Sequence, residues 1–309
     1  MALLVPLTLF TVMLALGVGL PLQAFRQWRQ TWPLVMRLEL ATCLLVPLVA
    51  WLLLLIPPAG QLSQEVRMAI ALMAACPSAP LILRKAGKTG GDASLAGLLQ
   101  VGAALLAIIT VPLLAQAAEP VFGVAGWDVL PRQVARQVAT VQLLPLLVGL
   151  WLRRSWPEHI RRLQGMLDRL ANGLLLVLFG AILIRIAPLL LAFAQANGIG
   201  LLWMALVVLA SLGLGYGLGG SAGDRKLTAA LVTSMRNPGL ALLLANTYAP
   251  QVPGLKIGIL TYLLITVLLS IPLIRRRRFE LGASFGKRRR FRSQLPPGFS
   301  GRAPFRAPH

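Results

Sequence analysis

Two short segments of this chain combine helix-breaking prolines with polar side chains that could line a binding site. The first is Cys76-Pro77-Ser78-Ala79-Pro80, and the second is Arg236-Asn237-Pro238-Gly239. Each interrupts a stretch that is otherwise apolar enough to span a membrane. Proline removes a backbone donor and clashes with the preceding turn, so the freed carbonyls need partners that lipid cannot supply. Both breaks are therefore expected to line a cavity inside the protein.

The composition indicates a membrane protein. The chain is 57% hydrophobic and only 13% charged, which excludes a water-soluble domain. At about 20 apolar residues per span, the sequence predicts an all-α integral membrane protein with about nine transmembrane helices. The predicted spans are roughly 2–23, 34–57, 67–84, 93–118, 134–152, 170–194, 199–220, 227–248 and 255–274.

The charges of the short loops predict the orientation. Loops after odd-numbered spans are rich in Lys and Arg, whereas loops after even-numbered spans carry few charges. Because cytoplasmic loops retain an excess of basic residues, we expect a multi-pass protein of the cell inner (plasma) membrane, with the N-terminus outside and the C-terminus cytoplasmic. The basic residues concerned are Arg26, Arg29, Arg37, Arg84, Lys85, Lys88, Arg153, Arg154, Arg161, Arg162, Arg169, Arg225 and Lys226.

The C-terminal segment is strongly basic. From Arg275 onward, eleven basic residues and one acidic residue, Glu280, supply ten of the net charge of +21. The run Arg275–Arg278 is typical of a stop-transfer anchor, and the cluster Lys287–Arg292 could hold the tail on anionic lipid. Nucleic-acid binding is not favoured. Four prolines and the lack of apolar periodicity after Phe291 predict a basic, disordered cytoplasmic tail over 276–309.

The spans also suggest an internal symmetry within a transporter domain over 1–275. Repeat 1 covers about 1–118, a linker span about 134–152, and repeat 2 about 170–275. The two repeats start on opposite sides and are therefore inverted, and the breaks fall in spans 3 and 8, the third helix of each. Inverted repeats with matching interrupted helices are typical of secondary transporters. The alternative is that prolines are simply common in membrane helices.

Several motifs resemble the bile acid:sodium symporter family, and the chain looks like a divergent bacterial-type member. The resemblance is carried by residues 76–80, 90–96 and 235–242, and by the segment from Met13 to Phe25, which is similar to that family's first core helix. It covers residues 1 to about 275. It implies two bundles of inverted repeats, with spans 3 and 8 crossing at their unwound centres, and transport of organic anions coupled to sodium.

The chain departs from the family at the positions that bind sodium there. A Ser-Asn pair, a Ser, a Thr, a Gln and a shared Glu are replaced, and the Gln of the second break becomes Arg236. The matching positions are Ile82, Leu83, Ala96, Gln100, Thr42 and Val232. Hard cations need several oxygen ligands, so Na+ is expected from the family but not from these residues, and coupling could be sodium-independent. No other cofactor and no metal site are predicted.

Arg236 is the leading candidate for substrate binding. A Glu with two sodium ions carries the same net charge, +1, as Val232 with Arg236, and a planar guanidinium suits a carboxylate or sulfonate. Alternatively, Arg236 snorkels to an interface or pairs with Asp92 or Glu39, although Glu39 is expected to be a solvated interfacial carboxylate. The predicted substrate-binding residues are Arg236, Asn237, Ser234, Thr233, Thr42 and Gln100, and the helix-break residues are Cys76, Pro77, Ser78, Pro80, Pro238 and Gly239.

The sequence therefore predicts a secondary active transporter of small organic anions, with membrane lipid as its other partner. An enzyme is not predicted, because the breaks carry no paired carboxylates, His cluster or activated Ser. Two alternatives remain open. One is arsenite-type metalloid efflux through Cys76, and the other is a non-transporting sensor or assembly subunit on the same fold, with the basic tail facing a partner.

Overall fold

The computed structural model describes residues 4–20, 28–77, 89–122 and 130–293, and these ranges contain helices but no strand. Within them, six helical segments are long and apolar enough to cross a membrane. Two shorter apolar helices cover Leu7–Gly19 and Ala187–Ala196. The all-α class is confirmed, and the count of nine spans stays a prediction.

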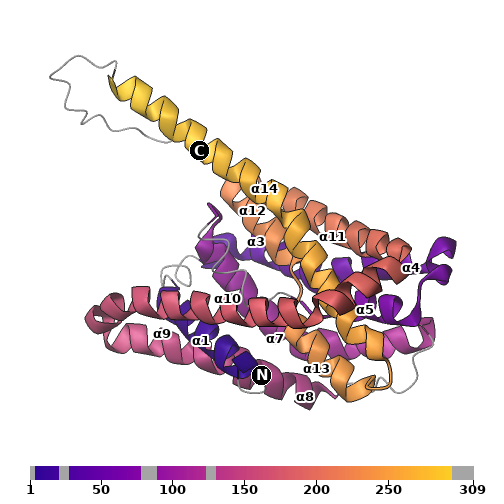
Figure 1. Ribbon diagram of the computed structural model, residues 1–309. Coiled ribbons are helices and arrows are strands. Elements are labelled where there is room, and N and C mark those ends of the chain that lie inside the picture. Colours follow the sequence, from indigo (N-terminus) through magenta and orange to yellow (C-terminus); the bar gives the residue numbers. More distant parts are fainter. Residues whose placement is uncertain (1–3, 21–27, 78–88, 123–129, 294–309) are drawn as a thin grey trace.

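A small bundle is built around the first helix (Figure 1). Its members are α1 (Leu4–Gly19), the continuous segment of α8 (Pro131–Val138), η3 (Ala139–Leu143) and α9 (Leu144–Ser155), and α10 (Pro157–Ala196). Helix α1 packs on α9 and α10. Gly17 and Gly149 lie at the α1–α9 contact, where a Cβ on either would overlap a backbone carbonyl oxygen of the other helix. Small residues let membrane helices approach this closely.

A large bundle holds the remaining helices, with α14 crossing α5, α11, α12 and α13 (Figure 1). Its buried core is almost wholly apolar. Its members are α3 (Trp28–Leu40), η1 (Ala41–Leu45), α4 (Val46–Leu55), η2 (Pro57–Gln61), α5 (Gln64–Ala75), α7 (Ala93–Phe122), α11 (Gly198–Leu218), α12 (Gly223–Ser234), α13 (Pro238–Tyr248) and α14 (Pro253–Ser293).

At each predicted helix break, the described residues contain the end or the beginning of a helix. Helix α5 ends at Ala75, and Cys76 has extended backbone angles. Between α12 and α13, Met235 and Asn237 are also extended, and α13 begins with Pro238. Proline favours this first helical position because its missing N–H would lack a helix partner there anyway. Ser78 and Pro80 lie outside the described residues.

Helix α14 differs from the predicted tail. It continues to Ser293, so residues 276–293 are helical where the sequence predicts disorder. Glu280 lies within 3.2 Å of Arg276 and 3.4 Å of Arg277, four and three residues earlier. Pairs at this spacing support an exposed helix against the repulsion of its like charges. Residues 294–309 lie outside the described ranges.

Two junctions between loops mark the opposite ends of the large bundle. At one end, Arg225 lies 3.8 Å from Asp92, and Arg277 donates to the Gly90 carbonyl at 3.4 Å. The loops that follow the odd-numbered predicted spans 3 and 7 thus meet the end of span 9. The turns before α5 and α11 join through the Ser63 hydroxyl, which donates to the Asn197 side-chain oxygen at 2.7 Å. Since α11 runs from this second junction to the first, the two junctions lie at opposite ends.

We expect Gly17→Ala to destabilise the small bundle. The added methyl group would overlap the Leu146 carbonyl oxygen, and overpacking of this kind costs about 1–3 kcal/mol. The midpoint of thermal unfolding in detergent should fall by several degrees. The control is Gly173→Ala on α10, where the added methyl group meets open space. An equal effect of both changes would contradict the tight α1–α9 contact.

Candidate functional site

The two helix breaks are joined by a backbone hydrogen bond. The Asn237 N–H donates to the Cys76 carbonyl at 3.1 Å. The Asn237 side-chain oxygen accepts from the Leu240 N–H, also at 3.1 Å, and so caps the start of α13. Asn237 therefore holds the end of α5 and the beginning of α13 together. The Cys76 carbonyl and the Leu240 N–H, which lack helix partners, both bond to it.

Arg236 points into the protein from this junction. Its side chain is fully buried, and its Nη1 donates to the Thr42 carbonyl at 2.8 Å. The prediction that Arg236 could snorkel to an interface is therefore wrong. Its Nε and Nη2 have no hydrogen-bond partner. These two nitrogens form one edge of the guanidinium, which is the edge that can hold a carboxylate or sulfonate in a bidentate manner.

The Thr42 carbonyl is available because the helix has a π turn here. In η1, the Val46 N–H donates to the Ala41 carbonyl, five residues back. The residue five positions after Thr42 is Pro47, which has no N–H to donate. The π turn and the proline together leave this carbonyl free for Arg236. π turns of this kind are frequent at functional sites.

A second π turn has the same sequence pattern. Both η1 and η3 follow the pattern Ala-Thr-x-x-Leu-x-Pro-Leu, at 41–48 and 139–146. In η3 the Leu144 N–H donates to the Ala139 carbonyl, and Pro145 stands five residues after Thr140. The sequence predicts Thr42 as a substrate-binding residue but does not single out its carbonyl. A proline five residues after a threonine is the signal that would have found it.

Two buried hydroxyl groups near Arg236 also lack hydrogen-bond partners, like the Nε and Nη2 of Arg236 itself. Tyr262 on α14 is fully buried near Arg236, and its hydroxyl has no hydrogen-bond partner. The Thr42 hydroxyl is also buried without a partner. Both can donate to an anion held by Arg236. Tyr262 was not predicted, although a tyrosine in an otherwise apolar span is a signal for a buried polar role.

Other predicted binding residues use their polar groups elsewhere. The Thr233 hydroxyl lies 2.9 Å from the Ser211 carbonyl of α11, and the Ser234 hydroxyl donates to Leu231 at 3.3 Å. Gln100 is buried on α7 and already engages a partner. The structure thus brings Arg236, Asn237 and Thr42 together with the α5 break, and it directs Thr233 and Ser234 to helix carbonyls.

The carboxylates named as alternatives do not pair with Arg236. Asp92 caps α7 by accepting from the Ser94 and Leu95 N–H groups and lies near Arg225. Glu39 is only 3% exposed, so the expectation of a solvated interfacial carboxylate is wrong. Among the carboxylates that the structure describes, none forms an ion pair with Arg236, so this alternative is also wrong.

Two of the positions matched to sodium ligands lie in apolar surroundings. Val232 belongs to an apolar cluster with Leu38 of α3 and Leu99 of α7, and Ala96 belongs to another apolar cluster. Neither offers an oxygen ligand, and Arg236 places a positive charge nearby. Ile82 and Leu83 lie outside the described residues.

The chain is similar to a known protein family over its N-terminal part. The model of the sodium bile acid symporter family matches residues 6–194, which is more than half of the 309-residue chain. A search of curated proteins finds no match. The matched range includes Glu39, Thr42 and the α5 break, whereas Arg236 lies beyond it.

We expect Asn237→Ala to loosen the junction of the breaks. The change removes the cap of α13, which costs about 1 kcal/mol, and the thermal unfolding midpoint should fall. Asn237→Ser should restore most of the stability because serine also caps helices. Asn246→Ala, at an exposed position of the same helix, is the matched control. Equal stability of Asn237→Ala and wild type would contradict the capping role.

Proposed function

We propose that this chain, which belongs to the sodium bile acid symporter family and is a multi-pass membrane transporter rather than an enzyme, carries organic anions bound at Arg236. Family membership implies a secondary transporter for a small solute. The proposal adds the charge of that solute and the group that binds it. The substrate class is an organic molecule with a carboxylate or sulfonate.

The observation that carries the proposal is the free edge of a fully buried guanidinium. Arg236 lies at the middle of the span Gly223–Tyr248, so its charge lies deep in the membrane. A charge at this depth costs at least about 2.5 kcal/mol, and such residues are usually functional or paired. With Nη1 held by Thr42, the remaining edge of Nε and Nη2 is oriented for a bidentate anion.

We further propose that this transport does not require sodium. Val232 is packed among leucines where the family pattern has the Glu shared by two sodium ions. Arg236 supplies a positive charge that is fixed to the protein. The net charge offered to the anion is then the same, without any dissociable cation.

The arrangement of the bundles is suited to alternating access. The third helix of each proposed inverted repeat is broken, and the two breaks are joined through Asn237 and Cys76. A side chain at Gly239 would reach Leu9 of α1, so the junction faces the small bundle. Rocking of one bundle against the other would expose the site to each side in turn. The basic end, with Arg225 and Arg277, is proposed to be cytoplasmic.

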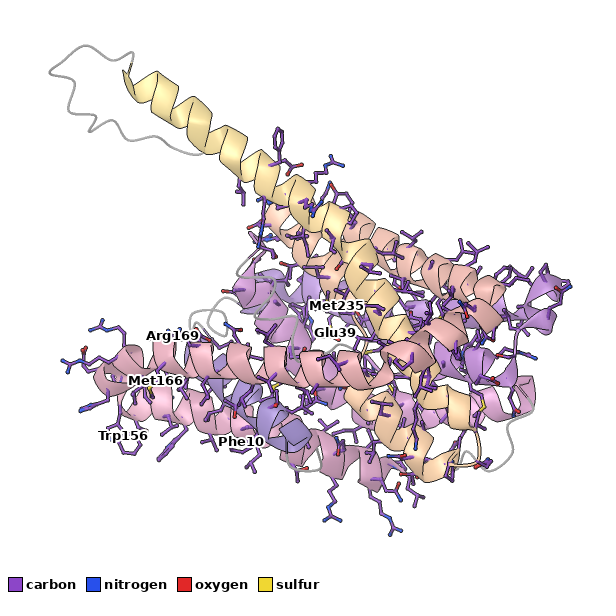
Figure 2. The ribbon with its side chains drawn as sticks, viewed as in Figure 1. Phe10, Glu39, Trp156, Met166, Arg169 and Met235 are labelled. Carbon is purple, nitrogen blue, oxygen red and sulfur yellow. The ribbon has the colours of Figure 1, made fainter. Side chains whose placement is uncertain are left out.

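We expect Arg236→Gln to abolish anion uptake because the charge and the bidentate edge are both lost. Purified protein in liposomes would be assayed with labelled taurocholate and benzenesulfonate, with sodium replaced by choline. Wild-type uptake should be unchanged by the replacement. The control is Arg169→Gln at an exposed position of α10 (Figure 2).

Two results would contradict this proposal. Normal uptake by Arg236→Gln would refute the anion site, and strict sodium dependence of the wild type would refute the sodium-free mechanism. Arsenite export that is lost in Cys76→Ser would instead favour metalloid efflux.

We expect Tyr262→Phe to weaken substrate binding without blocking transport. One hydrogen bond to a charged group contributes about 1.5–3 kcal/mol, so KM should rise roughly tenfold or more while the maximal rate is largely kept. Tyr216→Phe on α11 is the control, because its ring can still contact Lys226. An unchanged KM for Tyr262→Phe would exclude its hydroxyl from the site.

A further inference from the structure

Glu39 is a buried carboxyl group in the interior of the protein. The anion site proposed at Arg236 gives it no role. It lies in the span Thr31–Leu55, and Figure 2 shows it deep among the helices of the large bundle. Its Oε2 accepts from the Cys43 thiol at 3.8 Å, and its Oε1 has no hydrogen-bond partner. Buried ionisable groups at membrane depth are usually functional.

Helix α7 leaves room for this carboxyl group. A Cβ at residue 102 would lie 2.5 Å from Glu39 Oε1, so only glycine allows the carboxyl group its position. The α7 residues beside it, Gly102 and Ala103, carry no titratable side chain. The carboxyl group is thus surrounded by apolar side chains, the Cys43 thiol and the Ala103 backbone, and no cationic side chain that the structure describes forms an ion pair with it.

Glu39 is linked to the anion site through its own helix. Cys43 contacts Glu39 through its thiol and lies near Arg236, and the adjacent Thr42 carbonyl accepts from the guanidinium. The other titratable groups that face Arg236 are Cys76 from the break of α5 and Tyr262 from α14. Of Glu39, Cys43, Cys76 and Tyr262, Glu39 is the carboxyl group. Its negative charge, when it is ionised, could offset the positive charge of Arg236.

We propose that Glu39 binds one proton for each anion that binds at Arg236, so that the protein is a proton-coupled anion symporter. The inference rests on the proposed function. In the loaded carrier, Arg236, one anion and neutral Glu39 sum to zero charge. In the empty carrier, Arg236 and ionised Glu39 also sum to zero. The Glu39 carboxylate takes up a proton on the side where the anion enters and releases it on the other side.

Electrostatics opposes the uncoupled steps. An empty carrier with neutral Glu39 would reorient with a net positive charge in the membrane, and a loaded carrier with ionised Glu39 would reorient with a net negative charge. Both carry an unbalanced charge through a low-dielectric region, where its cost is greatest. Anion and proton therefore cross together, and the transport is electroneutral.

The experiment measures taurocholate accumulation in proteoliposomes under an imposed proton gradient. Taurocholate is chosen because a sulfonate stays ionised and does not cross the lipid as a neutral acid. Wild-type protein should accumulate it up to about tenfold for an inward gradient of one pH unit, and an imposed membrane potential should have little effect. Glu39→Gln should reach equilibrium without accumulation and should respond to the membrane potential, while exchange of labelled for unlabelled taurocholate persists.

Persisting exchange shows that the variant is folded and still binds the anion. Glu158→Gln, at an exposed position of α10, is the matched control and should behave as wild type. Wild-type uptake that depends on Arg236 but ignores the proton gradient would overturn this inference alone, as would unchanged accumulation by Glu39→Gln. The absence of any Arg236-dependent uptake would overturn the proposed function and this inference together.

Discussion

Every backbone polar group in the middle of a membrane protein must find its partner in the protein, and both helix breaks are arranged around that requirement. Pro77 and Pro238 end or begin helices, and the group freed at Cys76 accepts from Asn237. Pro47 leaves the Thr42 carbonyl without its helix donor, and that carbonyl receives Arg236. The prolines thus decide which carbonyls are available, and the hydrogen bonds between segments follow from them.

The apolar residues around the junction and the single charge within it form one arrangement. The cluster with Leu38, Leu99 and Val232 excludes water, so charges act on one another more strongly there than they would in water. Arg236 would be unfavourable beside bound cations, and Val232 alone would leave the site without positive charge. In the proposed site, Val232 and Arg236 are consistent with each other: without a bound cation there is no repulsion of Arg236, and Arg236 supplies the positive charge that Val232 cannot help to bind.

The sequence locates the breaks because the effect of proline is local, and it indicates Arg236 because a charge in an apolar span is conspicuous. It does not reveal Tyr262 or the Thr42 carbonyl, since these depend on how distant helices rotate toward the junction. From the sequence, Glu39 is expected at a cytoplasmic boundary, because it lies two residues after Arg37 near the start of the span predicted from residue 34. Helix α3 starts at Trp28, six residues earlier, which adds about 9 Å of helix before Glu39.

A fixed cation and a dissociable cation place different demands on a carrier. Sodium ions can leave with the anion, so an empty sodium-coupled carrier loses its positive charges before it returns. Arg236 cannot leave, and guanidinium does not deprotonate in proteins. A carrier that uses it must return with that charge unless a second group becomes negative, and the anion must not bring more negative charge than the arginine balances. The buried Glu39 lies three residues before Thr42 on the same helical segment. By the proposed mechanism it meets both demands, because it is ionised when the carrier is empty and protonated when the anion is bound.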